Sequence, residues 1–109
     1  MKRKITLPQL KKYDITQKVI EALANAESRA IIFSITRNGK TAAQLSTVLK
    51  IPLSSVYKKL TELENLTLIE IEKTVLSEEG KRFKVYKSRI NKAEILIKKS
   101  EPTVSLSAN

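Results

Sequence analysis

The 109-residue sequence contains no cysteine, no histidine and no tryptophan. Without cysteine and histidine it has no disulfide, no thiol nucleophile, no imidazole base and none of the usual zinc or iron–sulfur ligands. Carboxylates are the acid–base groups that remain, and no pattern of acidic residues marks a catalytic site. We therefore expect a protein that is not an enzyme and that holds no metal or other cofactor.

Long apolar runs are missing as well. No segment approaches the roughly 20 apolar residues of a membrane-spanning helix, and the basic N-terminus MKRKITLPQL lacks the apolar stretch of a secretory signal. Apolar residues make up 41% of the chain, which is ordinary for a globular domain with a modest core. We expect one cytoplasmic domain without membrane attachment.

Negative charge is scarce, and the two signs are separated along the chain. The net charge is +10. Residues 1–12 carry five basic and no acidic side chains, residues 41–59 three and none, and residues 81–99 eight and one, whereas residues 60–80 carry six acidic and one basic. These blocks predict one positive face and one negative face. A polyanion partner is one interpretation, and a lysine-rich solvated surface is the other.

The stretch 41–66, TAAQLSTVLKIPLSSVYKKLTELENL, organises the sequence. Apolar residues recur at helical spacing on both sides of a break at 50–52, namely Leu45, Val48 and Leu49 before it and Val56, Leu60 and Leu63 after it. Two short helices joined by about three residues are typical of a helix-turn-helix, whose second helix can enter the DNA major groove.

The flanking segments predict two helices before this pair and strands after it. The first helix covers 14–26 with Asp14 as its cap, and the second runs from an Asn25 cap to about Arg37. Residues 39–41 are short enough to pair as a minimal strand with the later hairpin. From Leu68 the period becomes two, which predicts a strand to about Leu76, a turn at 77–82 and a returning strand to near Ile90. For 91–109 a second hairpin is favoured over a helix because isoleucine is frequent and 103–107 alternates.

The candidate DNA contacts lie in and around the predicted recognition helix, 52–65. Thr41 is predicted to cap the helix before it, with Gln44 at the capping-box position, and can also contact phosphate. The outward residues of the recognition helix and the basic residues of the wing tip complete the set: Ser54, Ser55, Tyr57, Lys58, Lys59, Lys81, Arg82 and Lys84. Hydroxyls can bond bases or phosphates, and lysines favour phosphates. Tyr57 either contacts the DNA backbone or covers the core.

Arginine, asparagine and glutamine, the residues that usually read bases, are missing from the outward positions at the start of this helix. We therefore expect substantial reliance on backbone charge and DNA shape.

The sequence resembles the ArsR-like winged helix-turn-helix transcription regulators of archaea and bacteria from about residue 19 to 90. The segments that carry the resemblance are Ser28–Ile31, Thr41–Leu45, Ile51–Tyr57 and Leu68–Glu70. It implies a mainly α fold with a small antiparallel sheet (α+β), in which four helices are followed by a β-hairpin wing and a C-terminal strand segment. It implies no metal response, because metal-sensing members use cysteine, histidine or clustered acids.

Two positions depart from the family pattern. Glycine often stands where this chain has Lys50 in the turn and Thr67 after the recognition helix. A left-handed backbone at Lys50 would cost about 1 kcal/mol, so the turn is either strained or differently shaped. Asn65 is an alternative end for the recognition helix.

We divide the chain into a basic flexible arm (1–12), a winged-helix DNA-binding domain (13–90) and a C-terminal hairpin or tail (91–109). The arm either enters a minor groove or is a weakly phosphate-binding tail. The surplus of apolar side chains on the terminal elements, and the resemblance, predict a homodimer. Its expected contacts are Ile15, Val19, Leu23, Ile95 and Ile97.

The leading hypothesis is a homodimeric transcription regulator of double-stranded DNA. Helix 52–65 would enter the major groove, and the wing, 77–84, would lie on the phosphate backbone. One alternative is a protein-interaction adaptor of the transcription machinery, which the acidic block at 62–79 favours. Another is a non-specific nucleic-acid-binding protein, which the net charge favours.

Overall fold

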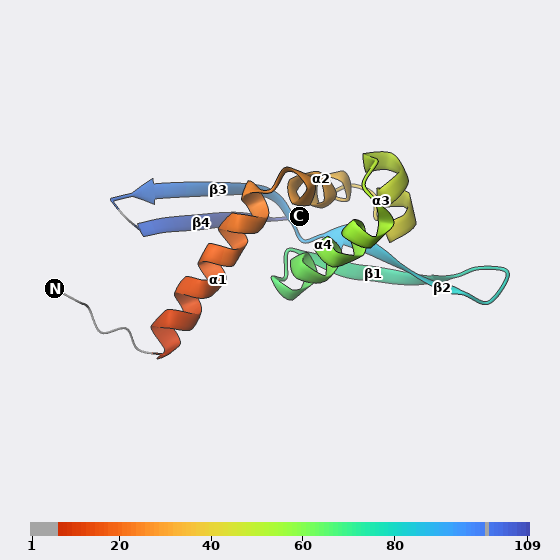
Figure 1. Cartoon of the computed structure of the whole chain (residues 1–109), viewed down its shortest axis with the longest axis horizontal. Coiled ribbons are helices and arrows are strands. Elements are labelled where there is room, and N and C mark those ends of the chain that lie inside the picture. The colour runs from red at the N-terminus through yellow and green to blue at the C-terminus, as the bar shows by residue number, and fades with distance from the viewer. Residues whose placement is uncertain (1–6, 100) are drawn as a thin grey trace.

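The segments with helical periodicity fold as four helices, and the period-two segments fold as two hairpins (Figure 1). The computed structural model describes the backbone of residues 7–99 and 101–109, with side chains from Ile15 onward. The elements in order are α1 (Leu7–Ala24), α2 (Ala26–Ser34), α3 (Ala42–Leu49), α4 (Leu53–Asn65), β1 (Ile69–Leu76), β2 (Arg82–Ser88), β3 (Ile90–Lys98) and β4 (Glu101–Ala108). This confirms the predicted α+β class with a β-hairpin wing.

The core lies where α2, α3 and α4 meet the base of the wing. Its fully buried side chains come from all of these elements: Ile31, Ile32, Ile35, Leu45, Val56, Leu60, Leu63, Leu68 and Ile69. The apolar positions Val56, Leu60 and Leu63, which predicted α4, therefore form its inward face. Burial of each such side chain contributes about 1.5–3 kcal/mol, so this cluster fixes how the helices pack.

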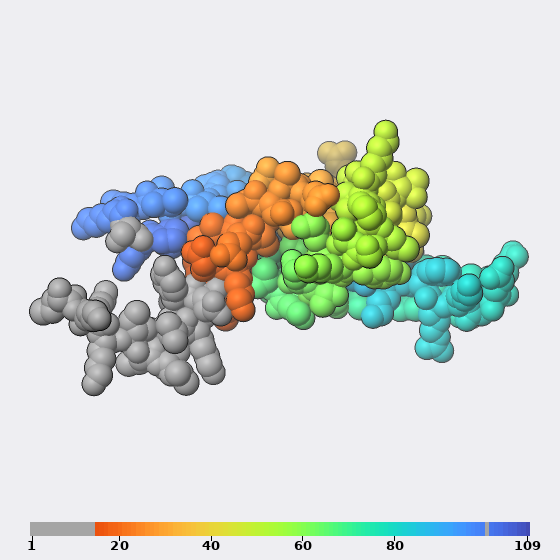
Figure 2. All heavy atoms as spheres, viewed as in Figure 1, coloured from red at the N-terminus to blue at the C-terminus, as the bar shows by residue number. Residues whose placement is uncertain are grey.

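The molecule is elongated because the two hairpins project in opposite directions from the helices (Figures 1 and 2). Its principal extents are 63 × 25 × 24 Å, and its radius of gyration is 16.3 Å. A compact chain of this length would have a radius of gyration of about 13 Å. The β1–β2 wing forms one end, and the β3–β4 hairpin forms the other, with β1 pairing only with β2 and β3 only with β4 among the described residues.

The turn after α2 brings the helices to the wing. The expected minimal strand is confirmed, because Lys40 forms an antiparallel bridge with Tyr86. The Asn25 cap of α2 is also confirmed, with its Oδ1 accepting from the Ser28 N–H at 2.9 Å. The helix, however, ends at Ser34 rather than near Arg37. The Ile35 carbonyl accepts from the Ser88 N–H at 3.0 Å, so the chain leaves the helix to meet β2.

The first helix begins earlier than the sequence indicated. The expected arm covered residues 1–12, but α1 already starts at Leu7, so residues 7–12 are helical and Asp14 lies inside the helix. Pro8 falls in the first turn, where its missing N–H breaks no helical hydrogen bond. Residues 1–6 of the expected arm lie outside the described residues. Neither α1 nor another helix of the described residues has the length and apolar character needed to span a membrane.

The C-terminal segment is the predicted hairpin. Its base joins the core, because Ile90 is buried and Ala93 and Val104 pack against the core cluster. The side chain of Asn109 donates to the carbonyls of Thr36 and Ser88 at 2.8 and 2.9 Å. These bonds hold the end of β4 beside α2 and β2.

Gly39 provides a test of how tightly the wing approaches the helices. A Cβ atom at this position would lie 2.7 Å from Val85 Cγ1 and 3.0 Å from the Tyr86 carbonyl oxygen. We predict that Gly39→Ala lowers the free energy of unfolding by about 1–3 kcal/mol, measured by urea denaturation. Gly80→Asn is the control, since no atom lies within 4 Å of an added Cβ there and asparagine tolerates a positive φ. Equal losses of stability for the two variants would contradict the close approach.

Candidate nucleic-acid interface

The first helix of the pair, α3, begins with the predicted capping box. Thr41 Oγ1 accepts from the Gln44 N–H at 3.2 Å, and the Thr41 N–H donates to Gln44 Oε1 at 2.8 Å. Two backbone N–H groups around the helix start are thus satisfied within the chain. Thr41 is half-buried, and its hydroxyl caps the N-terminus of α3.

The turn between α3 and α4 keeps the geometry that glycine usually provides. Lys50 adopts the left-handed conformation, with φ 56° and ψ 42°. The Lys50 and Ile51 N–H groups both point to the Ser46 carbonyl, and Ser46 Oγ donates to the Ile51 carbonyl at 2.6 Å. The sequence allowed either a strained left-handed turn or a turn of another shape, and the chain adopts the strained one. The burial of Ile51, directly after the turn, accounts for this strained conformation.

The turn after α4 also holds a residue with a Cβ atom in the left-handed conformation. Thr67 has φ 59°, its N–H donates to the Glu64 carbonyl, and the Leu68 N–H donates to the Leu63 carbonyl at 3.0 Å. This pair of bonds is the Schellman motif, which normally places glycine in the left-handed position. The helix ends at Asn65 as predicted, but Asn65 does not cap it, since Leu66 is the C-cap and Thr67 takes the left-handed position. Leu63 and Leu68 are both buried, and their burial fixes the turn at Thr67.

One face of α4 is free for a partner. Ser54, Tyr57 and Lys58 are exposed, as predicted from the helical period, whereas Ser55 is half-buried. Thr61, one turn further on, continues this exposed face, and its hydroxyl donates to the Tyr57 carbonyl at 3.0 Å. We call Leu53, Ser54, Tyr57, Lys58 and Thr61 the outer face of α4.

Lys59 does not belong to the outer face. Its Nζ lies 3.2 Å from Asn25 Oδ1 and 3.8 Å from Glu27 Oε1. Lys59 lines a groove of about 560 Å³ between α1 and α4. The structure therefore does not bring Lys59 together with the other predicted contacts of this helix, because its ammonium lies beside Asn25 and Glu27 at the start of α2.

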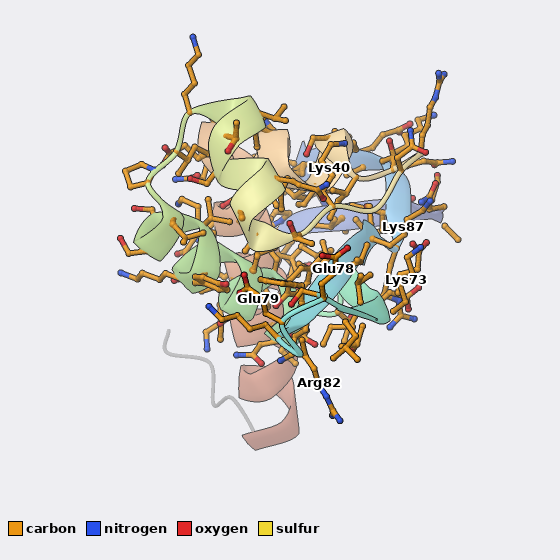
Figure 3. The ribbon with its side chains drawn as sticks, turned by 90° about the vertical axis from the view of Figure 1, so that its right-hand side faces the viewer. Lys40, Lys73, Glu78, Glu79, Arg82 and Lys87 are labelled. Carbon is orange, nitrogen blue, oxygen red and sulfur yellow. The ribbon has the colours of Figure 1, made fainter. Side chains whose placement is uncertain are left out.

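The wing carries its predicted basic residues on exposed positions. Lys81, Arg82 and Lys84 are exposed at and after the turn, where the Ser77 and Lys81 backbones pair and Ser77 Oγ accepts from the Lys81 N–H. Arg82 and Lys84 alternate with Phe83, so they share one strand face. Arg82 extends away from Lys40 and Lys87 (Figure 3).

The base of the wing packs against the helices, with α4 contacting β1. Tyr86 lies on the strand face of Arg82 and Lys84 and is buried at the base of the wing. Burial raises the pKa of the Tyr86 phenol above its ordinary value, and Glu64 and Tyr57 of α4 act in the same direction. Tyr57 is 51% exposed on the outer face of α4.

The expected dimer contacts separate into two groups. Val19 and Leu23 are buried in the core of the chain itself, so they have little surface left for a partner, and that part of the expectation is corrected. They face inward because α1 packs on α2. Ile15, Ile95 and Ile97 are exposed.

Leu53 is the residue of the outer face that the sequence patterns did not single out. It is 43% exposed and lies one turn before Tyr57, on the same side of the helix. The signal was the i, i+4 spacing to Tyr57, which places Leu53 outward although leucine usually marks the core.

Thr67 allows the strained turn to be tested. We predict that Thr67→Gly raises the free energy of unfolding by about 1 kcal/mol, because glycine adopts a positive φ without a Cβ clash. Thr61→Gly is the matched control, and it should lower stability by about 0.3–1 kcal/mol because the residue lies inside an exposed helix. Thermal or urea unfolding measures both, and destabilisation by Thr67→Gly would refute the strain.

No family model matches the chain, and no curated protein matches it. Among solved structures, the crystal structure of NolR from Sinorhizobium fredii is similar. The TM-score is 0.60 at 16% sequence identity, over 80% of this chain and 81% of the NolR chain. At this identity the likeness concerns the fold alone. Together with the α3–α4 pair and the β1–β2 hairpin, it shows that the chain has a winged-helix fold.

Proposed function

We propose that this protein is a DNA-binding transcription regulator of the ArsR-like winged-helix type. In this proposal α4 enters the major groove of double-stranded DNA, and the wing lies along the phosphate backbone. The observation that carries it is the adjacency of two exposed surfaces, the outer face of α4 and the basic strand face of the wing. The two surfaces belong to elements that pack together, because α4 contacts β1 of the wing, so one duplex can contact both.

In this proposal the chemistry of each exposed side chain determines which part of the DNA it contacts. Lys58, Lys81, Arg82 and Lys84 neutralise phosphates, which supplies affinity without sequence information. Ser54 lets the helix approach closely and can bond to a base or a phosphate. Thr41 contributes by capping α3, which keeps the helix pair in place, and the N-terminus of α3 attracts phosphate.

The acidic residues support DNA binding over the adaptor alternative. Within the acidic block, Glu70 pairs with Arg89 at 3.9 Å and Glu72 pairs with Lys87 at 3.7 Å. These carboxylates are partly neutralised by the neighbouring strand segment. The block therefore does not form one uniform acidic surface for a basic protein partner.

We further propose that the regulator is a homodimer formed through the β3–β4 hairpin. Cross-strand pairs share one face of a hairpin, and three successive alternate pairs are apolar: Ala93 with Leu106, Ile95 with Val104, and Ile97 with Pro102. The core takes up Ala93 and Val104, and α1 contacts β4. Ile95 and Ile97 stay 41% and 69% exposed.

A second copy of this chain is the occupant that best fits this face. The hairpin lies at the opposite end of the molecule from the wing (Figure 1), so its pairing leaves the DNA surface free. Lys98 and Glu101 face each other across the strands, and such mixed charge suits a self-complementary two-fold contact. A two-fold dimer would place two α4 helices about one DNA turn, ~34 Å, apart.

DNA binding is tested by salt titration. We predict that the chain binds a random-sequence duplex of about two helical turns and that affinity falls steeply with salt. Lys58→Ala combined with Lys81→Ala should lower the slope of log affinity against log salt by about 0.9 for each phosphate that is no longer neutralised. Fluorescence anisotropy with a labelled duplex measures the slope.

Lys59→Ala is the matched control, since it removes one charge from the same helix at a position held by Asn25 and Glu27. It should leave the slope nearly unchanged. Absence of duplex binding at low salt would overturn the regulator and leave the adaptor. Equal affinity for a duplex selected from a random pool and for bulk competitor would leave a non-specific binding protein.

The dimer is tested by two substitutions on one strand. We predict that Ile97→Asp converts the dimer to a monomer at micromolar concentration, because it buries a charge in the contact. Leu96→Asp is the control, since Leu96 is 62% exposed on the opposite strand face and should leave the dimer intact. Analytical ultracentrifugation measures both. A monomeric parent protein, or dissociation by Leu96→Asp alone, would contradict the proposed surface.

A further inference from the structure

The outer face of α4 begins with two exposed side chains that carry apolar surface. Leu53 is 43% exposed and Tyr57 is 51% exposed. They lie one helical turn apart on the same side of α4. The core-facing residues of α4 are Val56, Leu60 and Leu63, and all three are buried. Leu53 thus leaves apolar surface where the proposed function places DNA.

The polar residues around Leu53 have little capacity to distinguish bases. Ser54 can bond to any base edge or to phosphate, and Lys58 suits phosphate. The first two turns of α4 offer no arginine, asparagine or glutamine, the residues that form bidentate contacts with guanine or adenine. Sequence preference at this helix must therefore come from another kind of contact.

In the major groove, the base-edge group that suits an apolar side chain is the C5 methyl of thymine. We propose that Leu53, supported by Tyr57 beside it, reads thymine methyl groups and gives α4 a preference for thymine-containing steps. This inference rests on the proposed DNA-binding function and names the DNA class that the same site selects. Burial of one methyl group corresponds to about fourfold in affinity.

The experiment compares duplexes that differ by the methyl group. The probes are alternating A·T and A·U duplexes and alternating G·C and G·5-methyl-C duplexes of about 24 base pairs. Uracil lacks only the thymine methyl, and 5-methylcytosine adds a methyl at the same groove position. We expect tighter binding to A·T than to A·U by about fourfold or more, and tighter binding to the methylated G·C duplex.

Leu53→Ser assigns the effect to the side chain. It should bring the A·T to A·U ratio close to one while the salt slope stays the same, since every phosphate-binding lysine and arginine remains in place. Leu96→Ser is the control and should keep the parent ratio. It removes an exposed leucine from β3, which belongs to the hairpin at the opposite end of the molecule from the wing (Figure 1). Circular dichroism and thermal melting check that both variants fold.

The outcomes separate this inference from the function on which it rests. No binding to any of the four duplexes would overturn DNA binding itself. Binding with equal affinity for A·T and A·U would leave the regulator standing and overturn methyl reading. A ratio that survives Leu53→Ser unchanged would overturn the assignment to Leu53.

Discussion

Two backbone hydrogen bonds between Lys40 and Tyr86 connect the helical half of the molecule to its wing. The Lys40 N–H donates to the Tyr86 carbonyl at 3.1 Å, and the Tyr86 N–H donates to the Lys40 carbonyl at 2.8 Å. Because Gly39 precedes this bridge without a side chain, β2 approaches the α2–α3 connection closely. The direction of the wing relative to α4, and hence the shape of the candidate DNA surface, depends on this contact.

Two of the three non-glycine residues with a positive φ in the described part of the chain show how packing overrides local preference. Lys50 and Thr67 each accept a backbone conformation that costs about 1 kcal/mol or more for a residue with a Cβ. The side chains that follow them, Ile51 and Leu68, are buried, and each burial contributes about 1.5–3 kcal/mol. The favourable term is larger, so both turns keep the shape that positions α4.

The wing and the second hairpin lie at opposite ends of the molecule. The basic wing tip forms one end, while the apolar strand face of β3 and β4 forms the other. In the proposed regulator, one end contacts DNA and the other contacts a second protomer. The helices between them carry the outer face of α4, whose hydroxyl and apolar side chains suit close approach and methyl contacts better than bidentate base readout.

Much of the fold was readable in the sequence, because helical and strand periods, capping residues and turn residues act over a few positions. The apolar spacing around 50–52 predicted α3 and α4, Thr41 with Gln44 predicted the capping box, and alternation predicted both hairpins. The exposed positions Ser54, Tyr57, Lys58, Lys81, Arg82 and Lys84 followed from the same periods.

Only the tertiary structure decided which side chains remain free. Lys59 looked equivalent to Lys58, yet its ammonium meets Asn25 and Glu27, more than thirty residues away along the chain. Val19 and Leu23 looked like dimer contacts, but the packing of α1 on α2 buries them. Leu53 had no predicted role and is exposed. Local sequence determines which elements form, whereas their packing against distant segments determines which faces a partner can reach.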